Sequence, residues 1–296
     1  MRHLDHDHEL LLSVDFEDWH QLVRRRIGVS GWATPGPALG RQTAALLDLL
    51  DELGVKATFF VLGMAARAHP RLVEHVVARG HEIGCHGDTH LPVFSQSPAE
   101  FAADLRTARE TIEAITGRRP LGYRAPAFSI TENCAWAYGV LADQGFAYDA
   151  SQHDSPRIRD RIAPASAGPH PMQAEGTTLW EFPVAVWHGP RGRLPVGGAS
   201  YWALLPTGLV LRGLRGAGSM AGLYLHPHEL DPQPLRVGLP ARTSPGQRAH
   251  AALRGVQRNA ARRRAPEVLR AIAERHPLIT YGEAHARVSR GTTAGP

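Results

Sequence analysis

The chain has 296 residues, of which 43% are hydrophobic and 21% are charged, and its formal net charge is +5. This composition is typical of a globular protein and excludes an intrinsically disordered chain. The basic residues are scattered apart from two runs of three arginines, at residues 24–26 and 262–264. Because no basic stripe is interleaved with aromatic residues, we expect no nucleic-acid partner.

The cysteines and the apolar segments bear on where the protein resides. Cys85 and Cys134 have neither zinc-finger spacing nor the spacing of a disulfide framework, which favours two reduced thiols. The first ten residues lack the basic and then apolar pattern of a signal peptide. No run approaches the roughly 20 apolar residues that a membrane span requires. We therefore expect a cytoplasmic protein without a membrane span.

Apolar runs alternate with helical patterns along the chain. The expected strands cover residues 9–16, 56–62, 81–85, 121–124, 146–149, 179–186, 222–225 and 278–281. The expected helices cover residues 42–53, 71–78, 97–116, 134–144 and 266–275. The third helix has the clearest signals, because Ser97 and Glu100 can form a capping box and Gly117 can end the helix. Residues 163–176 and 232–247 are expected to be loops.

This alternation predicts an α/β fold with a parallel sheet and helices outside it. Polar residues end five of the expected strands: Asp15, His86, Arg124, Asp149 and His226. Active sites of (β/α) barrels are built at that rim, so we favour a distorted (β/α) barrel of about seven parallel strands over an open doubly wound sheet. The pattern resumes after each loop, and we expect one domain over residues 1–296.

Two clusters suit a hydrolytic metal site. Asp15, Glu17 and Asp18 follow a buried apolar strand, where acids are costly unless they are paired or bind a metal, although a solvated turn is the alternative. His86 and His90 are four residues apart, which in a helical turn places both imidazoles on one side. Two histidines with a carboxylate are typical of a divalent-metal site; we expect zinc, with cobalt, nickel or manganese as alternatives.

Five motifs in order resemble the polysaccharide deacetylase family, the NodB homology domain of carbohydrate esterase family 4. They are the acidic strand end, the His-x-x-x-His, the YRAP of residues 123–126, the YDAS of 148–151 and the YLHPHE of 224–229. All lie within residues 11–230, and residues 231–296 would complete the barrel with a loop, a helix and the last strand. EFPV at 181–184 and LPVGG at 194–198 are similar to the exosortase-associated branch.

The resemblance implies metal-dependent hydrolysis of N-acetyl groups of an amino sugar, an N-acetylated polysaccharide or a glycoconjugate, with release of acetate. Asp15 matches the family's general base, and Arg124 matches the residue that pairs with this base. His226 matches the general acid that protonates the leaving amine. Asp149 matches the carboxylate that orients and charges His226.

The resemblance makes His86 and His90 metal ligands and leaves the third ligand open. The family commonly has adjacent aspartates, the second of which binds the metal, whereas Phe16 follows Asp15 here. Strand alternation places Glu17 on the same face as Asp15. Asp18 has the usual ligand type and lies past the strand end, and we narrowly favour it.

Two alternatives of other kinds remain. One is a different linear or cyclic amide hydrolase on the same fold, of the deformylase or allantoinase type; the presence of His86 and His90 argues against the metal-independent version. The other is a non-catalytic sugar-binding module. The complete set of base, acid and ligands argues against such a module.

Overall fold

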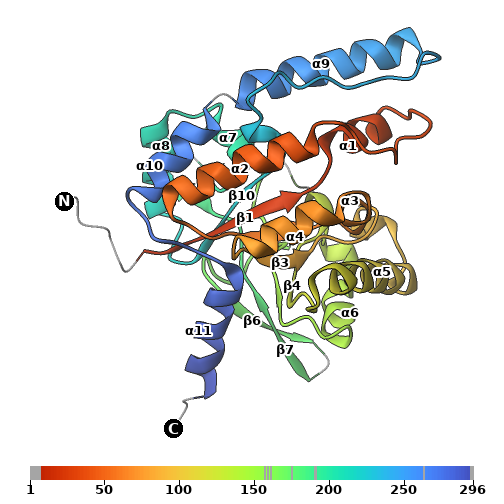
Figure 1. The fold of residues 1–296 in the computed structure, drawn as a ribbon. Helices are drawn as coiled ribbons and strands as arrows, with labels where there is room; N and C mark the ends of the chain where they lie inside the picture. The colour runs from red at the N-terminus through yellow and green to blue at the C-terminus, as the bar shows by residue number, and fades with distance from the viewer. Residues whose placement is uncertain are drawn as a thin grey trace.

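The protein is represented by a computed structural model that describes residues 8–156, 158, 160, 162–174, 176–189, 192–262 and 264–293. Its centre is a curled, mostly parallel sheet (Figure 1). In spatial order the strands are β10 (Ala221–Leu225), β1 (Leu10–Phe16), β2 (Thr58–Val61), β3 (Glu82–Cys85), β4 (Gly122–Tyr123), β5 (Tyr148–Asp149), β7 (Thr177–Glu181) and β6 (His170–Ala174). A further strand, β11 (Leu278–Ile279), pairs with the start of β1.

The sheet curls until its far end returns to β10. Just after β7, Val184 forms a bridge with Gly222 of β10, and the Gly222 amide donates to the Pro183 carbonyl over 2.8 Å. Gly222 has to be a glycine, because a Cβ there would collide with the hydroxyl of Tyr281. The expected distorted barrel is thus confirmed, with seven parallel strands along the path from β10 to β7.

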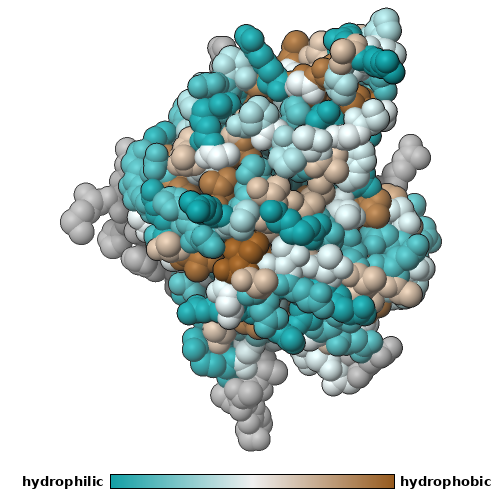
Figure 2. Space-filling model, turned by 45° about the vertical axis from the view of Figure 1, so that its right-hand side comes forward, coloured by the Kyte–Doolittle hydropathy of each residue, from teal (hydrophilic) through white to brown (hydrophobic). Residues whose placement is uncertain are grey.

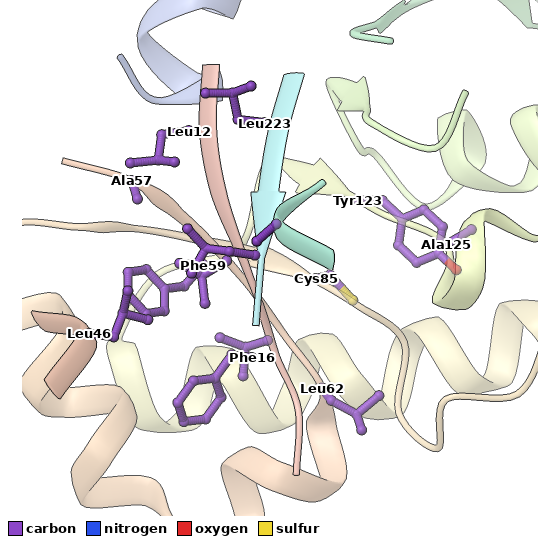
Figure 3. Close-up of a cluster of buried hydrophobic side chains, with 14 of the residues drawn as sticks. Leu12, Phe16, Leu46, Ala57, Phe59, Leu62, Cys85, Tyr123, Ala125 and Leu223 are labelled. Carbon is purple, nitrogen blue, oxygen red and sulfur yellow. The ribbon is translucent and has the colours of Figure 1, made fainter. Parts of the chain in front are cut away.

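Alternation along β1 separates the core from the site. Leu10, Leu12, Val14 and Phe16 face the helices in the main hydrophobic core, part of which is drawn in Figure 3. Leu11 faces the opposite, inner side, together with Phe60, Tyr148, Phe182 and Tyr281. Side chains at odd positions of β1 therefore point into the barrel interior, and this parity includes Ser13 and Asp15.

Helices cover the outside of the sheet (Figure 1). They are α1 (Trp19–Arg26), α2 (Leu39–Leu53), α3 (Gly63–Ala68), α4 (Pro70–Ala78), α5 (Pro98–Thr116), α6 (Ala137–Asp143), α7 (Ala199–Trp202), α8 (Thr207–Arg215), α9 (Pro245–Arg262), α10 (Ala265–Ala273) and α11 (Tyr281–Thr293). The expected capping box of α5 is present, with Ser97 and Glu100 bonded reciprocally and Gly117 left-handed at the end. Gly54 ends α2 in the same left-handed conformation, at φ 66°.

The structure corrects several sequence-based expectations. The expected loop at 163–176 contains β6, which runs antiparallel to β7 at the sheet edge. The expected strand at 179–186 divides into the end of β7 and the start of a hairpin, β8 (Val186–Gly189) with β9 (Gly192–Pro195). Helices α1 and α9 occupy segments where no helix was expected.

Two further findings concern the cysteines and the membrane. Cys85 and Cys134 are both buried free thiols. Among the described residues, none of the helices combines the length and the apolar character that crossing a bilayer would take.

Candidate active site

The carboxyl ends of the parallel strands bring the predicted rim residues together. Asp15 is the last residue but one of β1, His86 and Arg124 directly follow β3 and β4, and His226 directly follows β10. Asp149 ends β5. The side chains of four of these five residues share one network, and that of Asp149 has different partners.

Arg124 and Asp15 form a buried ion pair. The Nη1 of Arg124 donates to Oδ1 of Asp15 over 2.9 Å and to the Ser13 hydroxyl over 2.6 Å. Its Nε and Nη2 donate to the carbonyl of Ala150 and to the hydroxyl of Tyr281. Burial works to lower the pKa of Arg124, but Tyr281 and Asp15 outweigh it and raise that pKa. The guanidinium is therefore a fixed charge that holds the Asp15 carboxylate in one orientation.

Glu17, His86 and His90 converge beside this pair. One carboxylate oxygen of Glu17 lies 2.8 Å from Nε2 of His90 and 3.7 Å from Nε2 of His86. The three donor atoms lie within 4.8 Å of one another and all three residues are at least partly buried. Burial acts to raise the pKa of Glu17, but His90 and His86 outweigh it and hold the pKa well below its ordinary value.

The backbone prepares both histidines for this arrangement. Nδ1 of His86 lies 2.8 Å from the Arg124 carbonyl, which fixes Nδ1 as the donor and leaves Nε2 as the free lone pair. His90 has a φ of 57°, an uncommon conformation for a residue other than glycine, and its ring meets that of His86 edge-on at 5.4 Å. Such strain is typical of functional sites.

Asp18, which the sequence narrowly favoured as the third ligand, is engaged elsewhere. It is the N-cap of α1, where its carboxylate accepts from the amides of His20 over 2.9 Å and Gly36 over 2.5 Å. The carboxylate that faces His86 and His90 is that of Glu17. Strand alternation had placed Glu17 on the same face as Asp15. Asp18 has the usual ligand type, but its carboxylate caps α1 because that helix begins directly at Trp19.

His226 lies on the other side of Asp15 and Glu17. Its Nε2 is 3.9 Å from Asp15 Oδ2 and 3.5 Å from Glu17 Oε1. Its Nδ1 is 3.1 Å from an oxygen of Glu229. Burial works to lower the pKa of His226, but Glu229, Glu17 and Asp15 outweigh it and raise the pKa to about 9. Burial opposes ionisation of Glu229, yet the two neighbouring histidines, His226 first, lower its pKa to about 2.

Asp149 was expected to orient His226, and the structure assigns that place to Glu229. The carboxylate of Asp149 accepts from the Ser151 hydroxyl over 2.6 Å and from the Ser151 amide over 3.3 Å. It also shares a hydrogen bond with Glu181, which is fully buried with it. Burial and the charge of Asp149 raise the pKa of Glu181 well above its ordinary value, and burial also raises the pKa of Asp149. The expected role of Asp149 is therefore corrected.

Three residues of this network were not singled out from the sequence. Ser13 is a polar residue within a fully buried strand, which was a usable signal. Glu229 follows His226 by three residues, and the two form a capping box at the start of the short helix η4 (Pro227–Leu230). This spacing of a cap residue and a glutamate was also a usable signal. Tyr281 lies in the C-terminal segment where the family motifs are absent, and only the barrel brings it to Arg124.

Two further buried histidines, both neutral, lie near the candidate site. His153 packs its ring edge-on against Phe128 at 4.8 Å and lies 5.9 Å from Tyr224. His228 stacks at an angle near His226 and Trp19, at 5.1 and 5.9 Å. Burial lowers the pKa of both histidines to about 3. The charged imidazole of this group is therefore His226.

Comparisons with known proteins show similarity to polysaccharide deacetylases over part of the chain. Residues 35–142 match the family model described as polysaccharide deacetylase, and residues 152–264 match a domain of unknown function, DUF3473. The chitooligosaccharide deacetylase of Bradyrhizobium sp. is 35% identical over 123 residues, 41% of this chain and 53% of that protein. The peptidoglycan deacetylase-like protein FGM2 of Gibberella zeae is 30% identical over 48% of this chain and 43% of its own length. The matched part of the chain thus spans about half the length of these relatives.

Solved structures support the fold. A Mycobacterium smegmatis protein, provisionally assigned as a polysaccharide deacetylase, superposes with a TM-score of 0.62 at 20% identity. The alignment covers 98% of this chain and 93% of that one. The peptidoglycan deacetylase PdaC of Bacillus subtilis gives a TM-score of 0.50 at 16% identity, with 97% and 94% covered.

Proposed function

We propose that this chain, whose residues 35–142 match the polysaccharide deacetylase family model, is a metal-dependent hydrolase of N-acetyl groups on an amino sugar or N-acetylated glycan. One observation carries the proposal. A charged imidazole, His226, lies 3.9 Å from Asp15, a carboxylate fixed by a buried arginine, and 3.5 Å from Glu17 of a cluster suited to a cation. The narrower likeness to the exosortase-associated branch stays a prediction.

The donor set fits a divalent cation. Glu17, His86 and His90 offer one carboxylate oxygen and two imidazole nitrogens, the combination typical of hydrolytic zinc sites with open positions for water and substrate. The hydrogen bond of His86 to a backbone carbonyl is the usual support of a ligating histidine. When bound, the cation would polarise the acetyl carbonyl and lower the pKa of a water molecule. Zinc is the first expectation, with cobalt, nickel or manganese as alternatives.

Asp15 is placed to act as the base. Its Oδ1 accepts from Arg124, and its other oxygen, Oδ2, lies 3.9 Å from Nε2 of His226. That free oxygen accepts a proton from the water that attacks the acetyl carbonyl. Arg124 cannot supply a proton to Asp15, because guanidinium groups stay protonated, so the carboxylate remains available.

His226 is placed to act as the acid. Its Nε2 points at Asp15 and Glu17, and its Nδ1 is turned towards the ionised Glu229. An amine leaves poorly unless its nitrogen is protonated as the C–N bond breaks, and Nε2–H donates that proton. Glu229 holds the ring in the orientation that presents Nε2 to the substrate and stabilises its charge.

We infer that residues 1–296 act as one domain. The sheet draws strands from both segments matched by family models: β2, β3 and β4 lie in the first, and β7 and β10 lie in the second. His226 comes from the second segment and His86 from the first, so the candidate site needs both.

Release of acetate from a panel of N-acetylated sugars and oligomers, before and after chelation and metal restoration, tests the proposal. We expect at least one N-acetylated substrate to yield acetate, with loss on chelation and recovery on addition of zinc, cobalt, nickel or manganese. Activity on a formyl amide or a cyclic ureide alone would favour the other amide hydrolases. Binding of a sugar with no turnover under any metal would favour the sugar-binding module.

A further inference from the structure

Two segments that border the site contain arginine and no acidic residue. Residues 232–266 include eight arginines and neither Asp nor Glu. Residues 19–47 include four arginines and likewise neither Asp nor Glu. Helices α1 and α9, from these two segments, lie next to one another and project from one end of the molecule (Figure 1). The fold thus gathers positive charge that is scattered in the sequence.

The side of α9 that faces solvent is apolar. At 100° per residue, the exposed positions 249, 252, 253, 256 and 260 fall on one face, and they are Ala, Ala, Leu, Val and Ala. Leu253 is 55% exposed and Val256 is 69% exposed. Figure 2 shows hydrophobic residues among hydrophilic ones at the top of the molecule, the end at which Figure 1 places α9.

The opposite side of α9 is firmly held, so the apolar side is a genuine outer surface. Ala251 packs in a small buried cluster with Ile27 and Val29. The side chain of Gln247 donates to the carbonyls of Ile27 and Gly28. Arg258 donates to the Ser200 hydroxyl over 2.8 Å and lies 4.0 Å from Glu229, the partner of His226.

Arginines lie at the edge of the apolar face and behind it. Arg248, at the edge, donates to the carbonyls of Ala241 and Thr243, and Arg254, nearer the inner side of the helix, donates to His250. In the described part of the chain neither is paired with a carboxylate. Burial and then the charges of Arg26 and Arg258 lower the pKa of Arg254, which shows that these guanidinium groups crowd together. An outside anion would relieve this repulsion.

We propose that the outer face of α9 docks on an anionic phospholipid surface. An apolar stripe on a helix that carries arginines and no acidic residue is the pattern of a helix that lies in the membrane interface. Leucine and valine would enter the acyl boundary, while the long arginine stems keep their charges among the headgroups.

A second copy of this chain would bring arginines against arginines. Nucleic acid would leave the apolar stripe without a partner. Docking would place the candidate site close to the bilayer surface.

Flotation of the full chain with vesicles tests the proposal. Vesicles of phosphatidylcholine with about a third phosphatidylglycerol should carry the chain, vesicles of phosphatidylcholine alone should not, and salt should weaken the binding. Leu253→Gln combined with Val256→Gln should weaken binding at least about tenfold. Arg26→Gln with Arg254→Gln should weaken it about fivefold per arginine. Thermal melting curves establish that each variant is folded.

Matched controls lie elsewhere on the surface. Leu121→Gln alters a leucine that is 52% exposed far from α9, and Arg71→Gln with Arg106→Gln removes two exposed charges of α4 and α5. These controls should bind as the unaltered chain does. Equal binding to neutral vesicles, or full binding by the Leu253/Val256 variant, would overturn the proposal. A dimer that dissociates in that variant would also overturn it, in favour of self-association.

Discussion

Arg124 donates to Asp15 over 2.9 Å although 109 positions separate the two residues in the chain. The pairing depends on the barrel, since Arg124 directly follows β4 and Asp15 lies near the end of β1, with β2 and β3 between them. Arg124 is fully buried, and all three of its nitrogens donate to partners from different parts of the chain. The ion pair therefore links the fold of the barrel rim directly to the candidate base.

Arg124→Lys should impair both stability and activity. An ammonium group on a flexible stem cannot reach Ser13, Asp15, Ala150 and Tyr281 together, so the buried carboxylate of Asp15 loses a charged partner held in a fixed position. We expect a loss of about 3 kcal/mol in the free energy of unfolding, from urea titration, and at least a tenfold loss of kcat. Arg71→Lys, on the exposed side of α4, is the control and should change neither. Equal behaviour of the two variants would refute the role given to Arg124.

Asp15→Asn should leave the cation site and the fold in place while removing most turnover. The amide still accepts a hydrogen bond from Arg124 but cannot take a proton from water, and loss of a general base costs about 10²–10⁴ in rate. Acetate release and metal content, measured on the same preparation, check this expectation. A variant with near-normal turnover would mean that another group is the base.

Glu17→Gln and Asp18→Asn form a matched pair that identifies the third ligand. Glu17 faces His86 and His90, whereas Asp18 caps α1, a task that asparagine also performs. Titration calorimetry with Zn²⁺ should show that Glu17→Gln weakens binding by more than the roughly 10–100-fold typical of outer-shell changes. Asp18→Asn should bind as the unaltered protein does. The reverse result would restore Asp18 as the ligand.

Much of the barrel could be predicted because its strands are short apolar runs that end in polar residues. The helices that pack on the sheet, such as α5, could also be predicted, from their apolar periodicity and their capping residues. Helix α9 was missed because its large apolar residues face solvent and its buried contact comes from Ala251. Strand β6 was missed because it lies at the sheet edge, in a segment rich in proline and glycine.

The site residues that lie at fixed positions of a motif could be predicted from the sequence. Where two neighbouring residues could fill one role, the sequence alone was a weaker guide. Asp15, His86, His90, Arg124 and His226 occur in order and meet at the rim. The choice between Glu17 and Asp18 depended on where α1 begins, which the sequence did not reveal. Glu229 was not singled out as a partner of His226, because its position depends on the turn after β10, which brings Glu229 back to His226 over three residues.

Glu229→Gln and Asp149→Asn should therefore differ in their effect on acid catalysis. Loss of the Glu229 charge removes the main support for a protonated His226, so kcat on an N-acetyl sugar should fall about tenfold or more. Turnover of an activated acetate ester should fall much less, because a good leaving group needs no acid. His226→Ala should show the same selectivity with a larger effect, about 10²–10⁴.

Asp149→Asn should lack that selectivity, because its partners are Ser151 and Glu181. Its effect should appear in the melting temperature and fall equally on both substrates. If Asp149→Asn spares the ester while Glu229→Gln does not, the assignment of the two carboxylates is reversed.

The last prediction concerns stability in mild acid and a residue remote from the rim. The ring of His81 is buried against Phe59 at 5.1 Å, and its Nδ1 accepts from the amide of Ala57 over 3.2 Å. Burial first, then the nearby charges of Lys56 and Arg79, lower the pKa of His81 to about 4. An ordinary histidine has a pKa of about 6.5, so between pH 6.5 and 4 the unfolded chain binds a proton that the folded chain excludes. The contribution of His81 is complete above pH 6.5 and is lost as the pH falls through that window.

His81→Asn isolates this contribution, because its side-chain oxygen can still accept from Ala57 but cannot titrate. Urea unfolding of the unaltered protein between pH 7 and 5 should show stability falling with acidity, with other buried histidines adding to the slope. In His81→Asn the slope should be flatter by up to about 1.4 kcal/mol per pH unit, the effect of one proton. His75→Asn, on the exposed side of α4, the helix that ends just before His81, should keep the original slope, since its ring meets water in both states. An unchanged slope in His81→Asn would show that His81 does not resist protonation in the folded protein.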